Sequence, residues 1–267
     1  THSATAERAQ DMMVGSRSKA WDAVAAGLRE PQFQEQIALY KRRENLDLIA
    51  AWAPAHVRVA LKTDLFEEAF GTDALLDALA GIYPVIVGMD ISYVVAHAAK
   101  RRMTGAGHVV SDVCDLPFKD ASIDLVVSIS TLDHLPPPTL PGALAELCRV
   151  LAPGGCIVLT LDSRHNPLHV FSNALRRRLG RIHAERCYTV GEIRGALAGQ
   201  PVTVTEATAI YHIQFPLNFL AKRAERLLGA RADRLIGAVL RASAVLGTLP
   251  TRFLTGRYIA LRIVKRA

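Results

Sequence analysis

Short apolar runs recur along the middle of the chain, and each ends in an acidic or small polar residue. The clearest runs lie at 84–90, 123–130 and 156–162. Segments with helical spacing or turn residues separate them, and this alternation predicts the strands of a parallel α/β sheet. Because ligands of such sheets bind at the carboxyl ends of the strands, we look for candidate functional residues at those ends.

The same pattern continues through the chain and predicts seven strands. They are expected at 56–66, 84–90, 108–112, 123–130, 156–162, 202–210 and 257–264. Strand, helix and strand units of this length make right-handed crossovers, so the predicted fold class is α/β, with a doubly wound, mostly parallel seven-stranded sheet. We expect the last two strands to pair with each other.

Helical spacing fills the connections between these strands. Helices are expected at 31–54, 67–81, 93–102, 140–151, 168–179 and 189–197. In the fourth, leucines recur with helical spacing from Leu140 to Leu151, which predicts one face packed on the sheet. Residues 1–54 are interpreted as an amino-terminal helical cap and 55–267 as the main domain, with a helical insertion at 216–249 between the last two strands.

Positive charge is concentrated at one end of the chain. The whole protein has a formal net charge of +7, yet residues 216–267 contain eleven Lys or Arg and only two acidic residues. The remainder is therefore slightly acidic. This asymmetry indicates an anionic partner surface or an anionic substrate.

The insertion mixes leucines with basic residues, and three interpretations fit that composition. Its apolar face covers a substrate pocket, or it lies as a basic amphipathic helix on an anionic membrane, or it binds RNA. The substrate lid is the simplest of the three. No aromatic interleaving accompanies the charge, so we do not expect a nucleic-acid partner.

Other functional classes lack their sequence signals. The four cysteines form no CxxC pair and no Cys/His spacing typical of metal ligands, so no metal site is predicted. The absence of a Gly-x-Ser-x-Gly motif and of a P-loop argues against hydrolase and NTPase functions. No apolar run reaches the roughly 18 residues of a membrane span. We therefore expect a cytoplasmic protein with at most peripheral membrane association.

One long string carries a family resemblance. Residues 112–128 read D-x-x-x-LPF-x-D-x-SIDLVVS, and E-x-x-R-V-L with the turn APGG follows at 146–155. Over roughly 57–162 the chain resembles the methyltransferase type 11 group of class I S-adenosylmethionine (SAM) dependent methyltransferases. The resemblance implies a Rossmann-like methyltransferase fold, SAM as cofactor and S-adenosylhomocysteine as product.

The resemblance also implies which residues hold the nucleoside of the cofactor. An acidic residue at the end of the second strand can accept hydrogen bonds from both ribose hydroxyls, and Asp90, followed by Ile91, occupies that place. In the family an Asp after the third strand reads the adenine amino group. Asp112 and Val113 match that position, and Asp115 is an alternative partner for the adenine.

The loop after the first strand departs from the family. Its glycines, which let the backbone approach the cofactor closely, are missing, and two registers remain open. Reading forward from the strand makes Thr63 and Asp64 the first loop residues. Counting back from the second strand places Glu67 and Gly71 at the acidic and glycine positions instead. The first register is preferred because the apolar run ends there, and either one supplies a carboxylate for the cofactor's ammonium group.

The end of the fourth strand is the expected place of the reaction. Ser128 and Ile129 match the family residues beneath the methionine portion of the cofactor. His134 follows, close to where an acceptor would meet the methyl group, and a neutral imidazole there can deprotonate a hydroxyl or an amine. A structural or substrate-contacting role for His134 is an equal alternative.

Candidate substrate contacts lie on the helical cap and after two further strands. We assign this role to Tyr40, His165, Tyr211 and His212. The predicted function is SAM-dependent methyl transfer to a small-molecule or lipid-like acceptor, such as a natural product or cell-envelope metabolite. Two alternatives stay open: an enzyme of the same fold with altered or lost SAM chemistry, and a basic protein that binds a membrane surface or RNA. The sequence predicts no oligomeric state.

Overall fold

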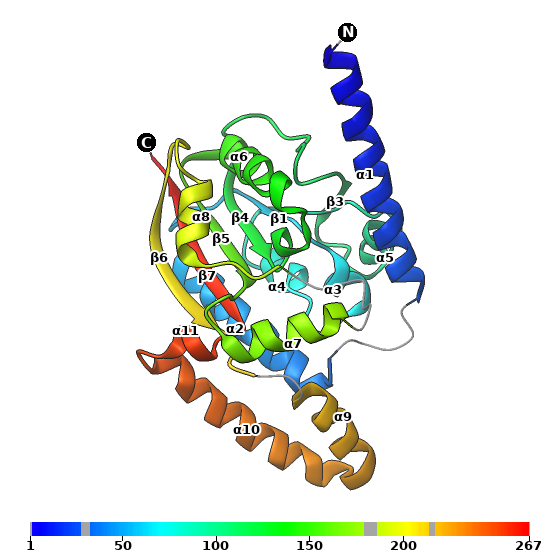
Figure 1. The fold of residues 1–267 in the computed structure, drawn as a ribbon, viewed down its shortest axis with the longest axis vertical. Helices are drawn as coiled ribbons and strands as arrows, with labels where there is room; N and C mark the ends of the chain where they lie inside the picture. Colours follow the sequence, from blue (N-terminus) through cyan, green and yellow to red (C-terminus); the bar gives the residue numbers. More distant parts are fainter. Residues whose placement is uncertain (1, 28–32, 179–185, 214–216, 267) are drawn as a thin grey trace.

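The computed structural model describes residues 2–27, 33–178, 186–213 and 217–266, and its centre is one seven-stranded sheet (Figure 1). The strand order is β3-β2-β1-β4-β5-β7-β6. The strands are β1 Val59–Lys62, β2 Val85–Asp90, β3 Gly107–Val110, β4 Ile123–Ile129, β5 Leu151–Asp162, β6 Val202–Ile210 and β7 Tyr258–Lys265. The neighbouring strands among β1 to β5 pair in parallel, whereas β7 runs antiparallel to β5 and β6. The predicted mostly parallel sheet is confirmed.

Helices cover both faces of this sheet. They are α1 His2–Gly27, α2 Glu35–Trp52, α3 Phe66–Phe70, α4 Leu76–Ala80, α5 Tyr93–Arg102, α6 Leu140–Val150, α7 Pro167–Arg178, α8 Val190–Ala196, α9 Leu217–Leu228, α10 Ala230–Thr248 and α11 Arg252–Thr255. Two 3₁₀ turns, η1 Leu132–His134 and η2 Pro137–Thr139, precede α6. Of the described residues, none belongs to a helix long and apolar enough to cross a bilayer.

Both faces of the sheet are apolar and buried, which explains the continuous apolar runs in the sequence. Along β4, Leu125, Val127 and Ile129 belong to one apolar cluster, and Val126 belongs to the other. This alternation is the two-residue period of a strand. The leucine face of α6 packs on the second cluster, as its spacing predicts.

The connection between β1 and β2 is where the structure corrects the sequence. The single helix predicted at 67–81 is wrong, because α3 ends at Phe70 and α4 begins only at Leu76. The buried carboxylate of Glu68 accepts hydrogen bonds from the amides of Leu75 (3.1 Å) and Leu76 (3.3 Å), which starts the second helix. The first strand is also shorter than predicted, since the chain leaves the sheet after Lys62.

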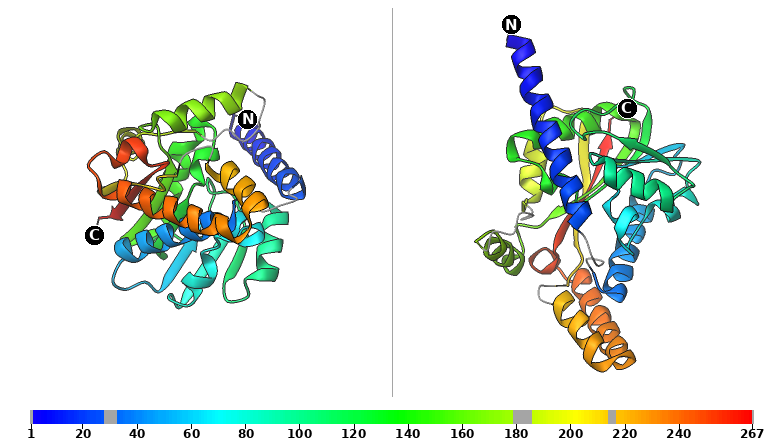
Figure 2. Two further views of the ribbon diagram at one scale, coloured as in Figure 1. Left: turned by 90° about the horizontal axis from the view of Figure 1, so that it is seen from below. Right: turned by 90° about the vertical axis from the view of Figure 1, so that its right-hand side faces the viewer.

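The helical insertion leaves the sheet at the edge where the parallel strands end. It follows β6, which runs parallel to β5 because both are antiparallel to their shared neighbour β7. The predicted long helix divides at Gly229, whose φ of +54° lies in the left-handed region, and α9 folds back on α10. Figures 1 and 2 show this hairpin projecting beyond the sheet at one end of the molecule.

A glycine substitution tests the turn before the apolar part of β5. A Cβ atom on Gly155 would lie 2.8 Å from the carbonyl oxygen of Ala152 and 2.9 Å from that of Asp124. Both are backbone atoms that cannot rotate away, so Gly155→Ala should lower the free energy of unfolding by about 1–3 kcal/mol. Urea denaturation followed by circular dichroism measures this change.

The matched control is Gly142→Ala in α6, where an added Cβ has no atom within 4 Å. Alanine is the better helix former, so this variant should be as stable as the parent or up to about 1 kcal/mol more stable. Equal stability of the two variants would contradict the close approach of Gly155 to the carbonyl oxygens of Ala152 and Asp124.

Candidate functional site

A cavity of about 370 Å³ lies at the carboxyl-terminal edge of the parallel strands. Its wall is built from the residues that follow β1, β2, β3 and β4, and α1 and α2 contribute further side chains. The following predicted site residues line it: Thr63, Asp64, Glu67, Asp90, Ile91, Asp112, Val113, Ile129 and His134. The alternation of strands and connections thus brings together segments that are far apart in the sequence.

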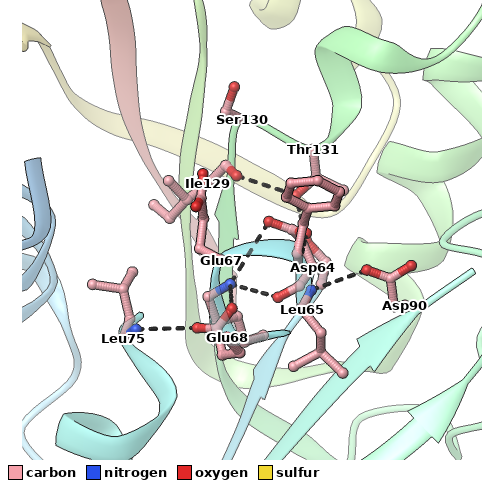
Figure 3. A network of polar contacts seen from close by, with 12 residues as sticks. Asp64, Leu65, Glu67, Glu68, Leu75, Asp90, Ile129, Ser130 and Thr131 are labelled. Carbon is pink, nitrogen blue, oxygen red and sulfur yellow. Dashed lines mark hydrogen bonds and ion pairs between the residues drawn. The ribbon is translucent and has the colours of Figure 1, made fainter. Parts of the chain in front are cut away.

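Asp90 stands at the end of β2 with its carboxylate held by two backbone amides. Oδ2 accepts a hydrogen bond from Leu65 N (3.1 Å), and Oδ1 accepts one from Ser92 N (2.8 Å). Figure 3 shows the first of these bonds. Burial and the nearby Asp64 carboxylate raise the pKa of Asp90 to about 7, although the two amides act in the opposite direction. Asp90 is therefore anchored in position and titrates near neutral pH.

Asp112 lies just beyond β3 and meets a residue of the amino-terminal helix. Its Oδ1 accepts a hydrogen bond from Cys114 N (3.0 Å), and the guanidinium of Arg17 in α1 forms an ion pair with Oδ2. One turn further along α1, Trp21 packs edge-on against Phe66 and His134, with ring centroids 6.0 and 5.0 Å apart. The helix α1 thus closes one side of the cavity.

The missing glycine loop is replaced by a buried network of charges. Lys62, the last residue of β1, is 2% exposed, and its ammonium lies 3.0 Å from Glu68 Oε2. It also donates a hydrogen bond to the carbonyl of Asp64. Burial alone lowers the pKa of Lys62, but Glu68 and Asp64 outweigh it and the pKa is raised. Figure 3 shows the hydrogen bond from the amide of Leu75 to the Glu68 carboxylate.

A second lysine joins the wall from α2. The ammonium of Lys41 lies 2.8 Å from Asp73 Oδ2 and 3.2 Å from Glu67 Oε1. Burial raises the pKa of Glu67 to about 8 despite Lys41, whereas Lys41 holds the pKa of Asp73 below its usual value against the effect of burial. At neutral pH this cluster therefore holds one ion pair, Lys41 with Asp73, beside a protonated Glu67.

Two predicted cofactor residues lie behind the wall. Ser128 is fully buried, and its Oγ lies 3.0 Å from the hydroxyl of Thr63. A Cβ atom on Gly71 would come within 2.3 Å of Glu67 Oε2 and 2.8 Å of Asp73 Oδ1, so a larger residue there would displace these two carboxylates. Both support neighbouring residues and do not line the cavity.

The end of β4 carries a strained residue at the cavity wall. Ser130 has a φ of +49°, a conformation that costs free energy in any residue other than glycine. It is held by hydrogen bonds from its amide to the carbonyl oxygen of Thr160 (3.0 Å) and from its hydroxyl to Asp133 Oδ2 (2.9 Å). The turn that follows presents His134 to the cavity.

The four predicted substrate contacts are absent from the described cavity wall. Tyr211 packs on Tyr258, which does line the cavity, at 5.8 Å between ring centroids, and Tyr40 lies one ring further out. His165 packs against Phe253. His212 Nδ1 lies 2.8 Å from the hydroxyl of Thr255, and burial lowers the pKa of this histidine. A position after a strand therefore did not suffice to place a side chain in the cavity wall.

Several residues of the wall were missed by the sequence prediction. They are Arg17, Trp21, Lys41, Lys62, Glu68, Asp73 and Arg257. A signal existed for one of them: Lys62 directly continues the apolar run Val59–Leu61, and a lysine at a strand position that faces the interior needs a buried partner. The other residues lie on segments that no sequence pattern places near this edge of the sheet.

The buried pair of Lys62 and Glu68 is open to a double-mutant test. Lys62→Met leaves the Glu68 carboxylate buried without its cation, so the free energy of unfolding should fall by about 3–5 kcal/mol. The double variant Lys62→Met/Glu68→Gln removes both charges and keeps an acceptor for the amides of Leu75 and Leu76. It should regain at least about 2 kcal/mol in the same urea titration. A double variant that is no more stable than Lys62→Met would show that the two charges do not interact.

Sequence comparison finds methyltransferases among the proteins that resemble this chain. The family model of a methyltransferase domain matches residues 67–159. A malonyl-[acyl-carrier protein] O-methyltransferase of Geobacter sulfurreducens is 32% identical over 193 residues, which cover 67% of this chain and 71% of that protein.

Solved structures share the fold at low sequence identity. The [4+2]-cyclase SpnF has a TM-score of 0.57 at 17% identity, over 85% of this chain and 81% of its own. The N-methyltransferase NodS of Bradyrhizobium japonicum, in complex with S-adenosyl-L-homocysteine, has a TM-score of 0.53 at 15% identity, over 86% and 88% of the two chains. With the strand order and the matched sequence, these relatives show that the chain belongs to the class I SAM-dependent methyltransferases.

Proposed function

We propose that this chain binds SAM in the cavity and transfers its methyl group to a small-molecule or lipid-like acceptor. The observation that carries the proposal is the joint position of Asp90 and Asp112, two carboxylates on neighbouring strand ends that line one cavity in a chain of this family. S-Adenosylhomocysteine is the other product. NodS, a structural neighbour that holds this product, supports the assignment of the cofactor.

The nucleoside half of SAM fits the side chains present. Each carboxylate oxygen of Asp90 uses one acceptor site for a backbone amide and keeps another for a ribose hydroxyl. Asp112 similarly keeps acceptor capacity for the adenine amino group beside Arg17. Ile91 and Val113 supply apolar surface on both sides of these acids.

The amino acid half of SAM is a zwitterion, and the wall offers both signs of charge. Asp64 is the carboxylate for its ammonium group in the preferred register of the loop. In the other register Glu67 takes that place, where the bound ammonium would lower the raised pKa of this carboxyl. Lys41 is the cation for its carboxylate, because its ammonium lies at the same wall, beside Asp73. Charged side chains thus replace the glycine backbone that does this work in the family.

Bound SAM supplies a methyl group on a positively charged sulfur, so the protein's remaining task is to position the acceptor and accept its proton. Trp21 and Phe66 form an apolar wall beside His134, which suits an acceptor with an apolar body. His134 is the proposed general base for a hydroxyl or amine. A relative named as an O-methyltransferase of a malonyl group supports a small acyl acceptor.

A second candidate is a same-fold enzyme whose reaction is not methyl transfer. The charged loop at Lys62 and Glu68 favours it, because glycines are lost where the family binds the cofactor. The structural neighbour SpnF is a [4+2]-cyclase, so the fold serves reactions of another class. Binding of SAM without its consumption in the presence of an acceptor library would favour this candidate.

Calorimetry with SAM and S-adenosylhomocysteine tests the proposed cofactor site. Asp90→Asn should weaken binding about 10- to 100-fold, because it removes charge-assisted hydrogen bonds to the ribose. The matched control, Asp115→Asn at an exposed carboxylate near the same edge, should bind within about twofold of the parent. No binding of either compound at about millimolar concentration overturns the proposal.

The affinity for SAM should depend on pH through Asp90. With a pKa of about 7, this carboxyl is protonated near pH 6 and ionised near pH 8, and only the ionised form accepts two hydroxyl bonds on free lone pairs. The affinity of the parent for SAM should therefore rise across about pH 6–8. The rise should be steeper than that of Asp90→Asn, whose pH dependence comes from groups other than Asp90. Parallel pH profiles would exclude Asp90 from the site.

A kinetic test addresses His134. If it accepts the acceptor's proton, His134→Ala should lower kcat about 100-fold or more while the dissociation constant of SAM changes little. His134→Gln, which keeps a polar side chain but no base, should be equally slow. A glutamine variant with parental kcat would assign His134 to packing against Trp21 instead.

A further inference from the structure

The α9–α10 hairpin carries two apolar surfaces. One packs on the body of the protein: Ala221, Ala232, Ile236 and Leu240 are buried in the same apolar cluster as Ile37 of α2. The other faces outward and holds four large side chains that are 50–71% exposed: Phe219, Leu220, Leu227 and Leu235. A helix pair that served only as a lid over the cavity needs the first surface and leaves the second unexplained.

Arginines lie among the exposed apolar side chains. Arg223 falls between Phe219 and Leu227 on the outward side of α9, and Arg231, Arg234 and Arg241 are exposed on α10. None of the four forms an ion pair with another described residue. Over 217–249 the chain has six basic residues and two acidic ones, so the outward surface is strongly cationic.

The position of the hairpin leaves this surface accessible. Figures 1 and 2 show α9 and α10 at one end of the molecule, with the sheet to one side of them only. The helix α10 packs on α2, and Gln34, the N-cap of α2, donates a hydrogen bond from its amide to Asn218 Oδ1 of α9 (2.9 Å). The same helix α2 supplies Lys41 and Asn45 to the cavity wall.

We propose that the outward surface of the α9–α10 hairpin docks on an anionic lipid bilayer. Arginine guanidinium groups bind anionic headgroups while the phenylalanine and leucine side chains enter the boundary of the acyl chains, as in other interfacial helices. A nucleic acid offers the charge complement but gives the exposed leucines no apolar environment. The helices lie on the membrane and do not span it.

Flotation with lipid vesicles tests the surface without any assay of methyl transfer, so its result is independent of the proposed function. The full chain should float with vesicles of phosphatidylcholine and phosphatidylglycerol and stay behind with phosphatidylcholine alone. Arg223→Glu/Arg231→Glu/Arg234→Glu should lower the partition coefficient at least about 100-fold, because each basic residue near an anionic surface contributes about fivefold.

A control variant changes the formal charge equally at other sites. Lys100→Glu/Lys119→Glu/Arg194→Glu reverses three exposed basic residues on α5, on the β3–β4 connection and on α8. Its partition coefficient should stay within about threefold of the parent, since charges beyond a Debye length are screened. Equal losses in the two triple variants would overturn the proposal, because net charge alone would then explain the binding.

The apolar contribution has its own pair of variants. Phe219→Ser/Leu227→Ser should weaken flotation at least about tenfold at unchanged charge. Ile82→Ser/Tyr93→Ser, at side chains 64% and 63% exposed elsewhere, should leave it unchanged. Circular dichroism and thermal unfolding establish that each variant folds. Binding to RNA that exceeds binding to anionic vesicles, or flotation indifferent to Phe219 and Leu227, would overturn the proposal.

Discussion

The ion pair between Lys62 and Glu68 fixes the floor of the cavity. Burying two charges at the end of a strand costs free energy that only a close partner and further hydrogen bonds can offset. Glu68 satisfies both conditions, since its carboxylate lies 3.0 Å from the ammonium and accepts the amides of Leu75 and Leu76. The β1–β2 connection therefore has one geometry, and that geometry carries Leu65 to within 3.1 Å of the Asp90 carboxylate.

This constraint explains how a methyltransferase fold persists without its glycine loop. Glycines solve the problem of close backbone approach by removing side chains. Here the side chains remain and pair within the network: Glu68, itself part of the cavity wall, accepts a hydrogen bond from the amide of Leu75 (Figure 3). A cavity of about 370 Å³ persists above them. What changes is its chemistry, because Lys41, Asp64 and Glu67 now line a region that backbone amides line in the family.

The sequence predicted the sheet and two acidic residues, Asp90 and Asp112, that line the cavity, and it missed the buried charge network. Alternation of apolar runs defined the strands, and Asp90 and Asp112 follow from strand-end position on β2 and β3, which are neighbours. The same rule placed Tyr211 and His212 beside the substrate, yet neither lines the cavity, because the rule ignores where a strand lies in the sheet. The strand before them, β6, is the edge strand farthest from β3, and two other strands separate it from β4. The pairing of Lys41 in α2 with Asp73 between α3 and α4 joins segments that no periodicity places together.

The basic segment 216–267 includes the α9–α10 hairpin, which the helix α2 connects to the cavity. One face of this helix carries Ile37 into the cluster shared with α10, and Lys41, one turn further on, enters the cavity wall. The buried side of the hairpin and the cavity wall therefore contact the same helix, at residues about 6 Å apart along its axis. A helix with both contacts buried cannot shift at one without moving the other, because packed interiors transmit displacement. The surface proposed to dock on a membrane is thus joined, through α10, to the helix that carries the Lys41–Asp73 pair.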